Sequence, residues 1–358
     1  MNVIKKHLMT AISYLIPIVV GAGFMLAIGN VAGGDEIENI DQGFNFFDVL
    51  TTMGGDILGL LPVVISTGIA FSIANKPGLA PGVAIGLAAN GIEAGFFGGL
   101  IGGFIAGYIA KFITDKLKVP DWAEGLKPML LIPLFSSIIS VLVMYFIIGK
   151  PVAAGTTLLE DYISNLDPTN LLIYGAIIGI LSSIDYGGPI NKTVFAFVLS
   201  LQSEGILEPI TVLMLASMVT PFGFTMAYFF QKISRKKIYT KEEIDTLKAA
   251  FPMGVLMITE GCYPIILKDV IRSVIATGVG GAIGGALSMF WGADSTVPHG
   301  GILAMFTMTK PLSFLAALLI GSLGTAVVFF ILKRPTSEED KDEEVADQDI
   351  NMDSVKLS

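Results

Sequence analysis

Charged residues are scarce in this 358-residue sequence. Asp, Glu, Lys and Arg together make up 15% of it, against about 25% in a typical soluble domain. Hydrophobic residues make up 53%, and the mean hydropathy is +0.73. Apolar runs of about 20 residues, long enough to cross a bilayer, recur from one end of the chain to the other. The composition therefore excludes an ordinary soluble domain and predicts an all-α polytopic membrane protein.

Cysteine and basic residues are also few. The single cysteine, Cys262, excludes an intramolecular disulfide and a cysteine-rich metal site, and we expect it to be a small apolar filler. The net charge of -9 gives no indication of a nucleic-acid partner. Much of the acid lies in 337–354, so the segment 336–358 is predicted to be a disordered acidic tail. We expect no bound metal and no cofactor.

The apolar runs predict about ten membrane spans. They lie near residues 8–31, 57–75, 80–95, 97–115, 127–149, 169–185, 191–203, 209–230, 271–291 and 311–332. The Gly-rich region 80–110 fits one re-entrant segment and one full span equally well, and 191–203 is shorter than the bilayer is thick. The first run is too long for the core of a signal peptide and is expected to be a retained span.

Lys and Arg in short loops predict the orientation of the spans. With ten spans, all the basic clusters fall on one side; they are Lys5–Lys6, Lys111–Lys118, Arg235–Lys241 and Lys333–Arg334. The acidic loops 35–41 and 160–167, with the single residues Lys150 and Lys310, fall on the other side. The pattern predicts a plasma-membrane protein with both termini in the cytoplasm.

Two apolar stretches, 250–268 and 292–310, do not fit as spans because Gly and Pro interrupt them. Non-helical backbone at membrane depth is tolerated only where protein or a water-filled cavity covers it, and interrupted segments indicate a transporter's substrate site. The first stretch, 256-LMITEGCYPIILKD-269, carries Glu260. We expect Glu260 at the tip of a re-entrant hairpin that faces a polar cavity. Alternatively, its carboxylate pairs with a lysine or caps a helix.

A third interruption is 182-SSIDYGGPINK-192. Asp185 ends one apolar run, Gly187-Gly188-Pro189 breaks the helix, and Asn191-Lys192 opens the next run. The segment is either a cytoplasmic turn with solvated charges or an unwound link whose carbonyls and Asn191 amide face a ligand. His299, in the motif VPHGG, is likewise either a turn residue or a ligand contact.

Five motifs in fixed order carry a family resemblance. They are KHLMTAISYLIPIVVGAGFMLAIG, EGLKPMLLIPLFSS, SSIDYGGPINK, ITEGCYP and GALSMFWGADSTVPHGG. From about residue 5 to 333 the chain resembles the fructose-type enzyme IIC membrane component of the bacterial phosphoenolpyruvate-dependent sugar phosphotransferase system. In that family Ile-Thr-Glu-Gly is followed by small residues and Pro-Phe. This chain has Cys262-Tyr263-Pro264-Ile265 instead, which bears on the sugar subtype.

The resemblance implies the ten-span glucose–fructose–lactose fold with two re-entrant hairpins, near 250–268 and 292–310. Residues 1–335 would form the membrane domain, with 1–165 as the scaffold and dimerisation half and 166–335 as the substrate-transport half. A homodimer in the lipid bilayer is implied. The Gly-rich run 95–111 independently favours close helix packing, either at a dimer interface or inside one subunit.

The resemblance also implies a function. Such a permease subunit translocates fructose or a similar sugar while a phosphocysteine on a separate IIB partner phosphorylates it; IIA, HPr and enzyme I resupply the phosphoryl group. Glu260 would bind sugar hydroxyls and accept the hydroxyl proton as the catalytic group, with Asn191, His299 and Gly300 as further sugar contacts. The residues expected to hold the site in shape are Asp185, Gly187, Gly188, Pro189, Lys192, Gly261 and Pro264. Lys192 could instead meet the incoming phosphoryl group.

Two other functions stay open on the residues alone. One is a sugar transporter or sensor that does not phosphorylate its ligand. The other is a channel-like or ion-coupled carrier in which Glu260 binds a cation or a proton.

Overall fold

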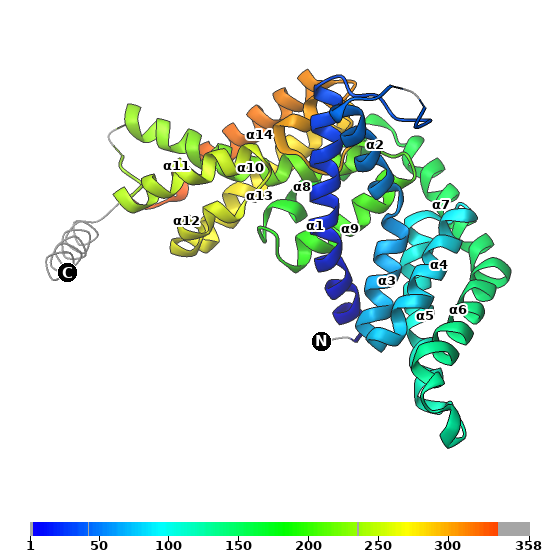
Figure 1. Ribbon diagram of the computed structural model, residues 1–358. Helices are drawn as coiled ribbons and strands as arrows, with labels where there is room; N and C mark the ends of the chain where they lie inside the picture. Colours follow the sequence, from blue (N-terminus) through cyan, green and yellow to red (C-terminus); the bar gives the residue numbers. More distant parts are fainter. Residues whose placement is uncertain (1–2, 42, 235, 336–358) are drawn as a thin grey trace, which may run out of the picture. The chain divides into compact units, whose positions relative to one another are not determined.

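The computed structural model describes residues 3–41, 43–234 and 236–335 (Figure 1). Every regular element in these ranges is a helix, as the composition predicts. The predicted acidic tail at 336–358 lies outside the described residues. The chain divides into two compact units, which are described separately. The first contains the described residues up to 167 with 192–210 and 294–309, and the second contains 168–191, 211–293 and the described residues from 310 onward.

The first unit is built mainly from the N-terminal helices. They are α1 (Val3–Val31), α2 (Phe46–Gly59), α3 (Leu61–Ala74), α4 (Leu79–Gly91), α5 (Gly95–Lys116), α6 (Ile132–Val143) and α7 (Gly149–Ser164). Short π-helical segments at Lys127–Leu131 and Met144–Ile148 flank α6. Most of α9 (Pro189–Ser203) and the 3-10 helix η6 (Gly301–Thr307) also belong to this unit. Within it, α3 packs on α1, α4 and α5, and η6 packs on α1.

The second unit contains the C-terminal helices. They are α8 (Pro168–Ser183), α10 (Glu208–Ile233), α11 (Lys241–Val255), α12 (Tyr263–Lys268), α13 (Val270–Phe290) and α14 (Pro311–Leu332), with the 3-10 helix η5 (Glu260–Cys262) between α11 and α12. Here α13 is central and packs on both α8 and α14. Two of the five boundaries between the units fall inside helices, in the first turn of α9 and of α10.

Local sequence signals mark where several helices begin. At the start of α2, Asn45 and Asp48 form a capping box, in which each side chain accepts from the other residue's backbone N–H. Thr240 and Glu243 do the same for α11. Proline occupies the first turn of α14 at Pro311, where its missing N–H would have no helical partner.

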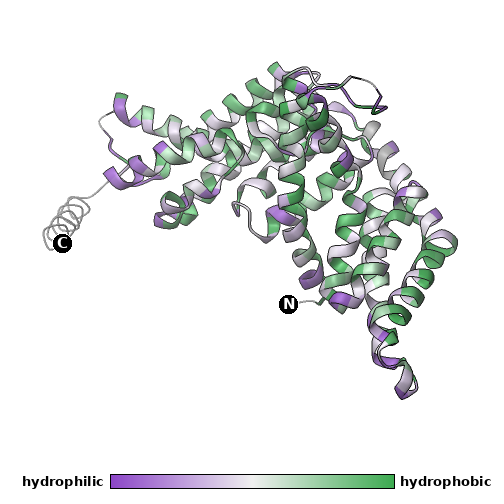
Figure 2. Ribbon diagram, viewed as in Figure 1, coloured by the Kyte–Doolittle hydropathy of each residue, from purple (hydrophilic) through white to green (hydrophobic). Residues whose placement is uncertain are grey.

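The described ranges contain six helical segments long and apolar enough to cross a bilayer, or seven if the pair α2–α3, bent by 49°, is one span. Figure 2 shows hydrophobic residues along most of the helices, with hydrophilic residues gathered at helix ends and on α11. The two doubtful spans of the sequence fall on α4 (13 residues) and α9 (15 residues). At 1.5 Å per residue these are shorter than the hydrocarbon core, so the count of ten remains a prediction.

The Gly-rich run 95–111 packs inside the subunit. A Cβ atom on Gly99 would lie 2.4 Å from the carbonyl oxygen of Pro62, and one on Gly103 would lie 2.8 Å from the Cα of Ser66. These glycines of α5 therefore let its backbone approach α3 closely. Of the two interpretations offered by the sequence, intramolecular packing accounts for these glycines.

The closest helix contact in the second unit joins α8 and α13. A Cβ atom on Gly179 would lie 2.0 Å from the carbonyl oxygen of Gly281, and one on Gly285 would lie 2.3 Å from the carbonyl oxygen of Gly175. Backbone atoms cannot move aside as a flexible side chain can. This contact therefore requires glycine, and it holds the end of α8 in place.

We expect Gly179→Ala to lower the apparent melting temperature of the purified protein in detergent, because overpacking of this kind costs about 1–3 kcal/mol. Gly278→Ala on α13 is the matched control, since its new methyl group would lie 3.4 Å from a methyl of Ile184. A Gly179→Ala protein that melts no earlier than the wild type and Gly278→Ala would contradict this account of the contact.

Candidate site at two breaks in the helices

The chain between α8 and α9 makes a tight turn through residues 184–188. Tyr186 (φ 49°) and Gly187 (φ 87°) both have left-handed backbone conformations, which are uncommon for a residue other than glycine. The N–H of Gly188 donates to the carbonyl of Asp185 at 2.9 Å and closes the turn. The sequence predicts this break from Gly187-Gly188-Pro189, but not the left-handed tyrosine.

Asp185 holds the start of α9. Its carboxylate accepts hydrogen bonds from the backbone N–H of Ile190 at 2.6 Å and of Asn191 at 2.9 Å. Such bonds satisfy donors that have no partner inside the helix, and the negative charge opposes the positive end of the helix dipole. A Cβ atom on Gly188 would lie 2.8 Å from this carboxylate. Asp185 therefore caps the start of α9, and Gly188 leaves room for its carboxylate.

Asn191 fastens the same break from the other side. Its side-chain amide donates to the carbonyl oxygen of Ser182 at 2.7 Å, and this carbonyl lies at the C-terminal end of α8. An asparagine amide has two N–H donors and an oxygen with two lone pairs. One donor thus has a structural use, and Asn191 keeps further hydrogen-bonding capacity.

The second break lies between α11 and α12 and carries Glu260. The helix α11 ends at Val255, Met257 has a positive φ of 69°, and Glu260 begins the short 3-10 helix η5. The residue after it, Gly261, packs closely on α11, because a Cβ there would lie 3.1 Å from the Cα of Ala250. Pro264 stands in the first turn of α12. No regular helix passes through Glu260, as its Gly and Pro neighbours predict.

The two breaks meet within the second unit. The hydroxyl of Tyr263 donates to the carbonyl oxygen of Tyr186 at 2.7 Å. A Cβ atom on Gly187 would lie 3.2 Å from Oε1 of Glu260, so this carboxylate lies directly beside the α8–α9 turn. The side chain of Glu260 is exposed. The arrangement presents an accessible carboxylate next to backbone whose own hydrogen bonds are already made.

Three residues in this contact were not predicted from the sequence. The hydroxyl of Tyr186 lies 3.0 Å from Oγ1 of Thr277 on α13, and that threonine hydroxyl lies 3.1 Å from the carbonyl oxygen of Ser183. Tyr263 was noted only as a departure from the family pattern. A hydroxyl side chain inside an apolar run is only a weak indication that it joins two breaks. The hydrogen-bond partners of these residues lie 77 to 94 residues away in sequence.

His299 and Gly300 belong to the first unit, where residues 294–300 form no helix. Nδ1 of His299 accepts a hydrogen bond from the backbone N–H of Gly300 at 2.9 Å, and Gly300 has a φ of 130°. The imidazole lies against Phe24 of α1, with ring centroids 5.6 Å apart. An Nδ1 that accepts this bond carries no proton, so a neutral ring presents its Nε2–H as a donor.

The other two predicted residues are placed as follows. Lys192 is half-buried near the start of α9 and groups with the first unit. Cys262 is fully buried, in an apolar cluster with Phe224, Ile265 and Phe329. The cysteine thus occupies the position of a small apolar filler, as expected. Asp185, Gly187, Gly188, Pro189, Asn191, Glu260, Gly261 and Pro264 all belong to the second unit.

The known proteins that this chain resembles share related descriptions. The family model "Phosphotransferase system, EIIC" matches residues 9–321. The chain is 40% identical to the PTS system fructose-specific EIIB'BC component of Haemophilus influenzae over 94% of its own length and 60% of the relative. It therefore spans less than two thirds of that curated relative. It is also 37% identical to the fructose permease IIC component of Bacillus amyloliquefaciens, over 84% of this chain and 98% of the relative.

A solved structure shares the fold. The crystal structure of the transporter ChbC, the IIC component from the N,N'-diacetylchitobiose-specific phosphotransferase system, superimposes with a TM-score of 0.53 at 14% identity, covering 91% of this chain and 92% of that one. The arrangement of helices is thus that of a IIC transporter. Together with the match over residues 9–321, this shows that the chain belongs to the phosphotransferase system EIIC family.

Proposed function

We propose that this protein is the membrane subunit of a sugar phosphotransferase permease, and that it carries fructose or a fructose-like sugar across the plasma membrane. The observation that carries the proposal is the exposed carboxylate of Glu260 on broken backbone beside the α8–α9 turn. A carboxylate on irregular backbone in an apolar unit is suited to bind a polar ligand. The printed names of the relatives, fructose-specific components and a fructose permease, support the sugar class.

The contacts of the site residues support the following roles. Glu260 accepts hydrogen bonds from sugar hydroxyls and takes the proton of the hydroxyl that becomes phosphorylated. Asn191 binds the sugar through the amide N–H and the amide oxygen that are not used in its hydrogen bond to the α8 carbonyl. His299 donates through Nε2, and the neighbouring Gly300 lets the backbone approach the sugar. Lys192 either supports the break or neutralises the incoming phosphoryl group.

The phosphoryl group comes from a IIB partner, which IIA, HPr and enzyme I resupply. The 358 residues contain one cysteine, and its burial among apolar side chains leaves no access for phosphoryl transfer. Relatives named EIIB'BC and EIIABC support coupling to IIB and IIA. In this step the sugar oxygen attacks the phosphorus of the phosphocysteine. The S–P bond breaks, and Glu260 holds the hydroxyl proton.

Two halves of the chain, which differ from the two compact units, divide the work in this proposal. The N-terminal helices, from residue 1 to about 165, form the scaffold of a homodimer. The later half, 166–335, with hairpins near 250–268 and 292–310, moves the sugar. Both termini lie in the cytoplasm, where IIB reaches the site.

The central test is Glu260→Gln, with Glu36→Gln in an exposed loop as the matched control. Hydrogen bonds to a charged group contribute about 1.5–3 kcal/mol each. At about 1.4 kcal/mol per factor of ten, fructose binding should weaken by about one to two orders of magnitude. Loss of a general base lowers the rate by about 10²–10⁴-fold, so phosphorylation should fall further than binding. Calorimetry measures binding, and phosphoenolpyruvate-driven formation of sugar phosphate in vesicles with the soluble partners measures transfer.

Normal binding and an unchanged transfer rate in a folded Glu260→Gln protein would make Glu260 a structural residue. Uptake that follows an ion gradient and forms no sugar phosphate would instead favour an ion-coupled carrier. His299→Ala should weaken binding with a smaller separate effect on transfer.

A second test concerns the donor. Cys262→Ser and Cys262→Ala should both keep substantial sugar phosphorylation when a cognate IIB is supplied, since the thiol only fills space. The purified chain without IIB should bind sugar and transfer no phosphate. If both folded variants lost transfer while still binding sugar, Cys262 would have a role in the chemistry.

The proposed orientation is tested with reporter fusions. A fusion after residue 340 should be active only with a cytoplasmic reporter, because the basic clusters of the short loops lie on that side under a ten-span count. A fusion in the acidic loop 35–41 should behave in the opposite way. A periplasmic signal after residue 340 would refute the orientation.

A further inference from the structure

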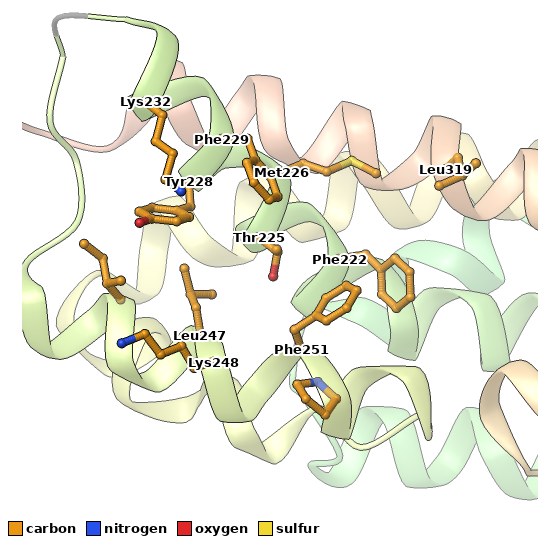
Figure 3. Close-up of a pocket in the computed structure, with 12 residues that line it drawn as sticks. Phe222, Thr225, Met226, Tyr228, Phe229, Lys232, Leu247, Lys248, Phe251 and Leu319 are labelled. Atoms are coloured by element: carbon orange, nitrogen blue, oxygen red, sulfur yellow. The ribbon is translucent and has the colours of Figure 1, made fainter.

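An apolar groove runs between α10 and α11 in the second unit, and no residue of the proposed sugar site lines it. Its volume is about 630 Å³, within the range of about 300–1,000 Å³ usual for ligand sites. The side chains that form its apolar part are Phe222, Met226, Phe229, Leu247, Phe251 and Leu319. Figure 3 shows these side chains directed into one continuous space.

The groove exists because α11 turns only part of its surface to the protein. Leu247, Ala250 and Gly254 are buried, whereas Lys248 and Phe251 are exposed. The helix is fixed at its start by a buried ion pair between Glu243 and Lys333, which follows α14. The groove is thus a stable part of the second unit. It is open on the side where it borders the apolar helix α10.

Cationic groups lie at one end of the groove only. Figure 3 shows Lys232 and Lys248 on either side of Tyr228, away from Phe222 and Leu319. Nζ of Lys232 lies 4.7 Å from the centroid of the Tyr228 ring. The ion pairs found in the described ranges include none for Lys232, whereas Lys248 pairs with Asp245 at 2.6 Å. Asp245 offsets the charge of Lys248 and leaves that of Lys232 in place.

The uncharged polar groups of the groove do not suit a sugar. Thr225 donates its hydroxyl to the carbonyl oxygen of Pro221 at 2.7 Å, inside its own helix. The hydroxyl of Tyr228 lies at the cationic end. The remaining wall is aliphatic and aromatic, so a ligand must be apolar along most of its length and anionic at one end.

We propose that this groove binds an anionic glycerophospholipid, with an acyl chain along the apolar wall and the headgroup phosphate at Lys232 and Lys248. The charge complementarity at one end and the apolar remainder together match that amphiphile. Basic residues near the membrane surface attract anionic lipids. The other side of α11 packs on Gly261, next to Glu260, so an occupied groove stabilises the helix that supports Glu260.

Native mass spectrometry of the delipidated full-length protein tests the proposal, with phosphatidylglycerol and phosphatidylcholine of the same acyl chains as probes. Phosphatidylglycerol should bind more tightly and raise the apparent melting temperature, because a ligand that binds only the folded state stabilises it. Lys232→Gln should weaken phosphatidylglycerol binding by about one to two orders of magnitude, the value of one hydrogen bond to a charged group. Lys248→Gln should weaken it less, since Asp245 already offsets that charge.

Lys237→Gln is the control, because it removes a charge from an exposed residue five positions from Lys232 that does not line the groove. It should leave phosphatidylglycerol binding unchanged. Thr225→Phe, which fills the groove and keeps every charge, should weaken the binding of both lipids. These measurements use no sugar, so their outcome is separate from that of the proposed transport activity.

Three results would overturn the proposal. One is equal binding of phosphatidylglycerol and phosphatidylcholine by the wild type. The second is an equal loss in Lys237→Gln and Lys232→Gln, which would assign the effect to general basic charge. The third is binding of sn-glycerol 3-phosphate as tight as that of phosphatidylglycerol, which would indicate a phosphate site with no use for the apolar wall.

Discussion

Backbone hydrogen bonding is the constraint on which the second unit depends. In a bilayer core no water satisfies the N–H and C=O groups that a broken helix releases, so the protein must supply partners. The α8–α9 turn meets this requirement with its own residues: Asp185 accepts from two N–H groups of α9, and Asn191 donates to a carbonyl of α8. Tyr263 donates to a second carbonyl, that of Tyr186. Because these groups are satisfied internally, the irregular backbone persists beside the exposed carboxylate of Glu260.

Close helix packing makes those hydrogen bonds possible. Gly179 and Gly281 bring α8 and α13 to backbone contact, and this contact places Thr277 within reach of Ser183 and Tyr186. A larger residue at either glycine would separate the helices by more than a hydrogen bond can span. The small residues of the apolar runs thus decide the position of the polar ones, and through them the position of the turn beside Glu260.

The helix α11 joins the two ligand-related features of the unit. Its start is fixed by the capping box of Thr240 with Glu243 and by the buried pair of Glu243 with Lys333, whose ammonium also lies 4.6 Å from the Tyr239 ring. Removal of one partner of a buried ion pair leaves the other charge buried without compensation, which costs about 3–5 kcal/mol. With α11 held this way, one face supports Gly261 and the other forms the wall of the apolar groove. A substitution on either face of α11 is therefore expected to alter the structure at the other face.

The sequence by itself determined the class of fold and the places where helices break. Hydropathy is a local property, so apolar runs reveal helices, and Gly and Pro reveal their interruptions at 185–189 and around Glu260. Composition also fixed Cys262 as the only thiol. Only the tertiary structure decided that Asp185 caps a helix and that Gly99 and Gly103 pack on α3. It also decided that Tyr186, Tyr263 and Thr277 form the hydrogen bonds around the two breaks. These outcomes depend on contacts between residues tens of positions apart, which packing creates and no local pattern encodes.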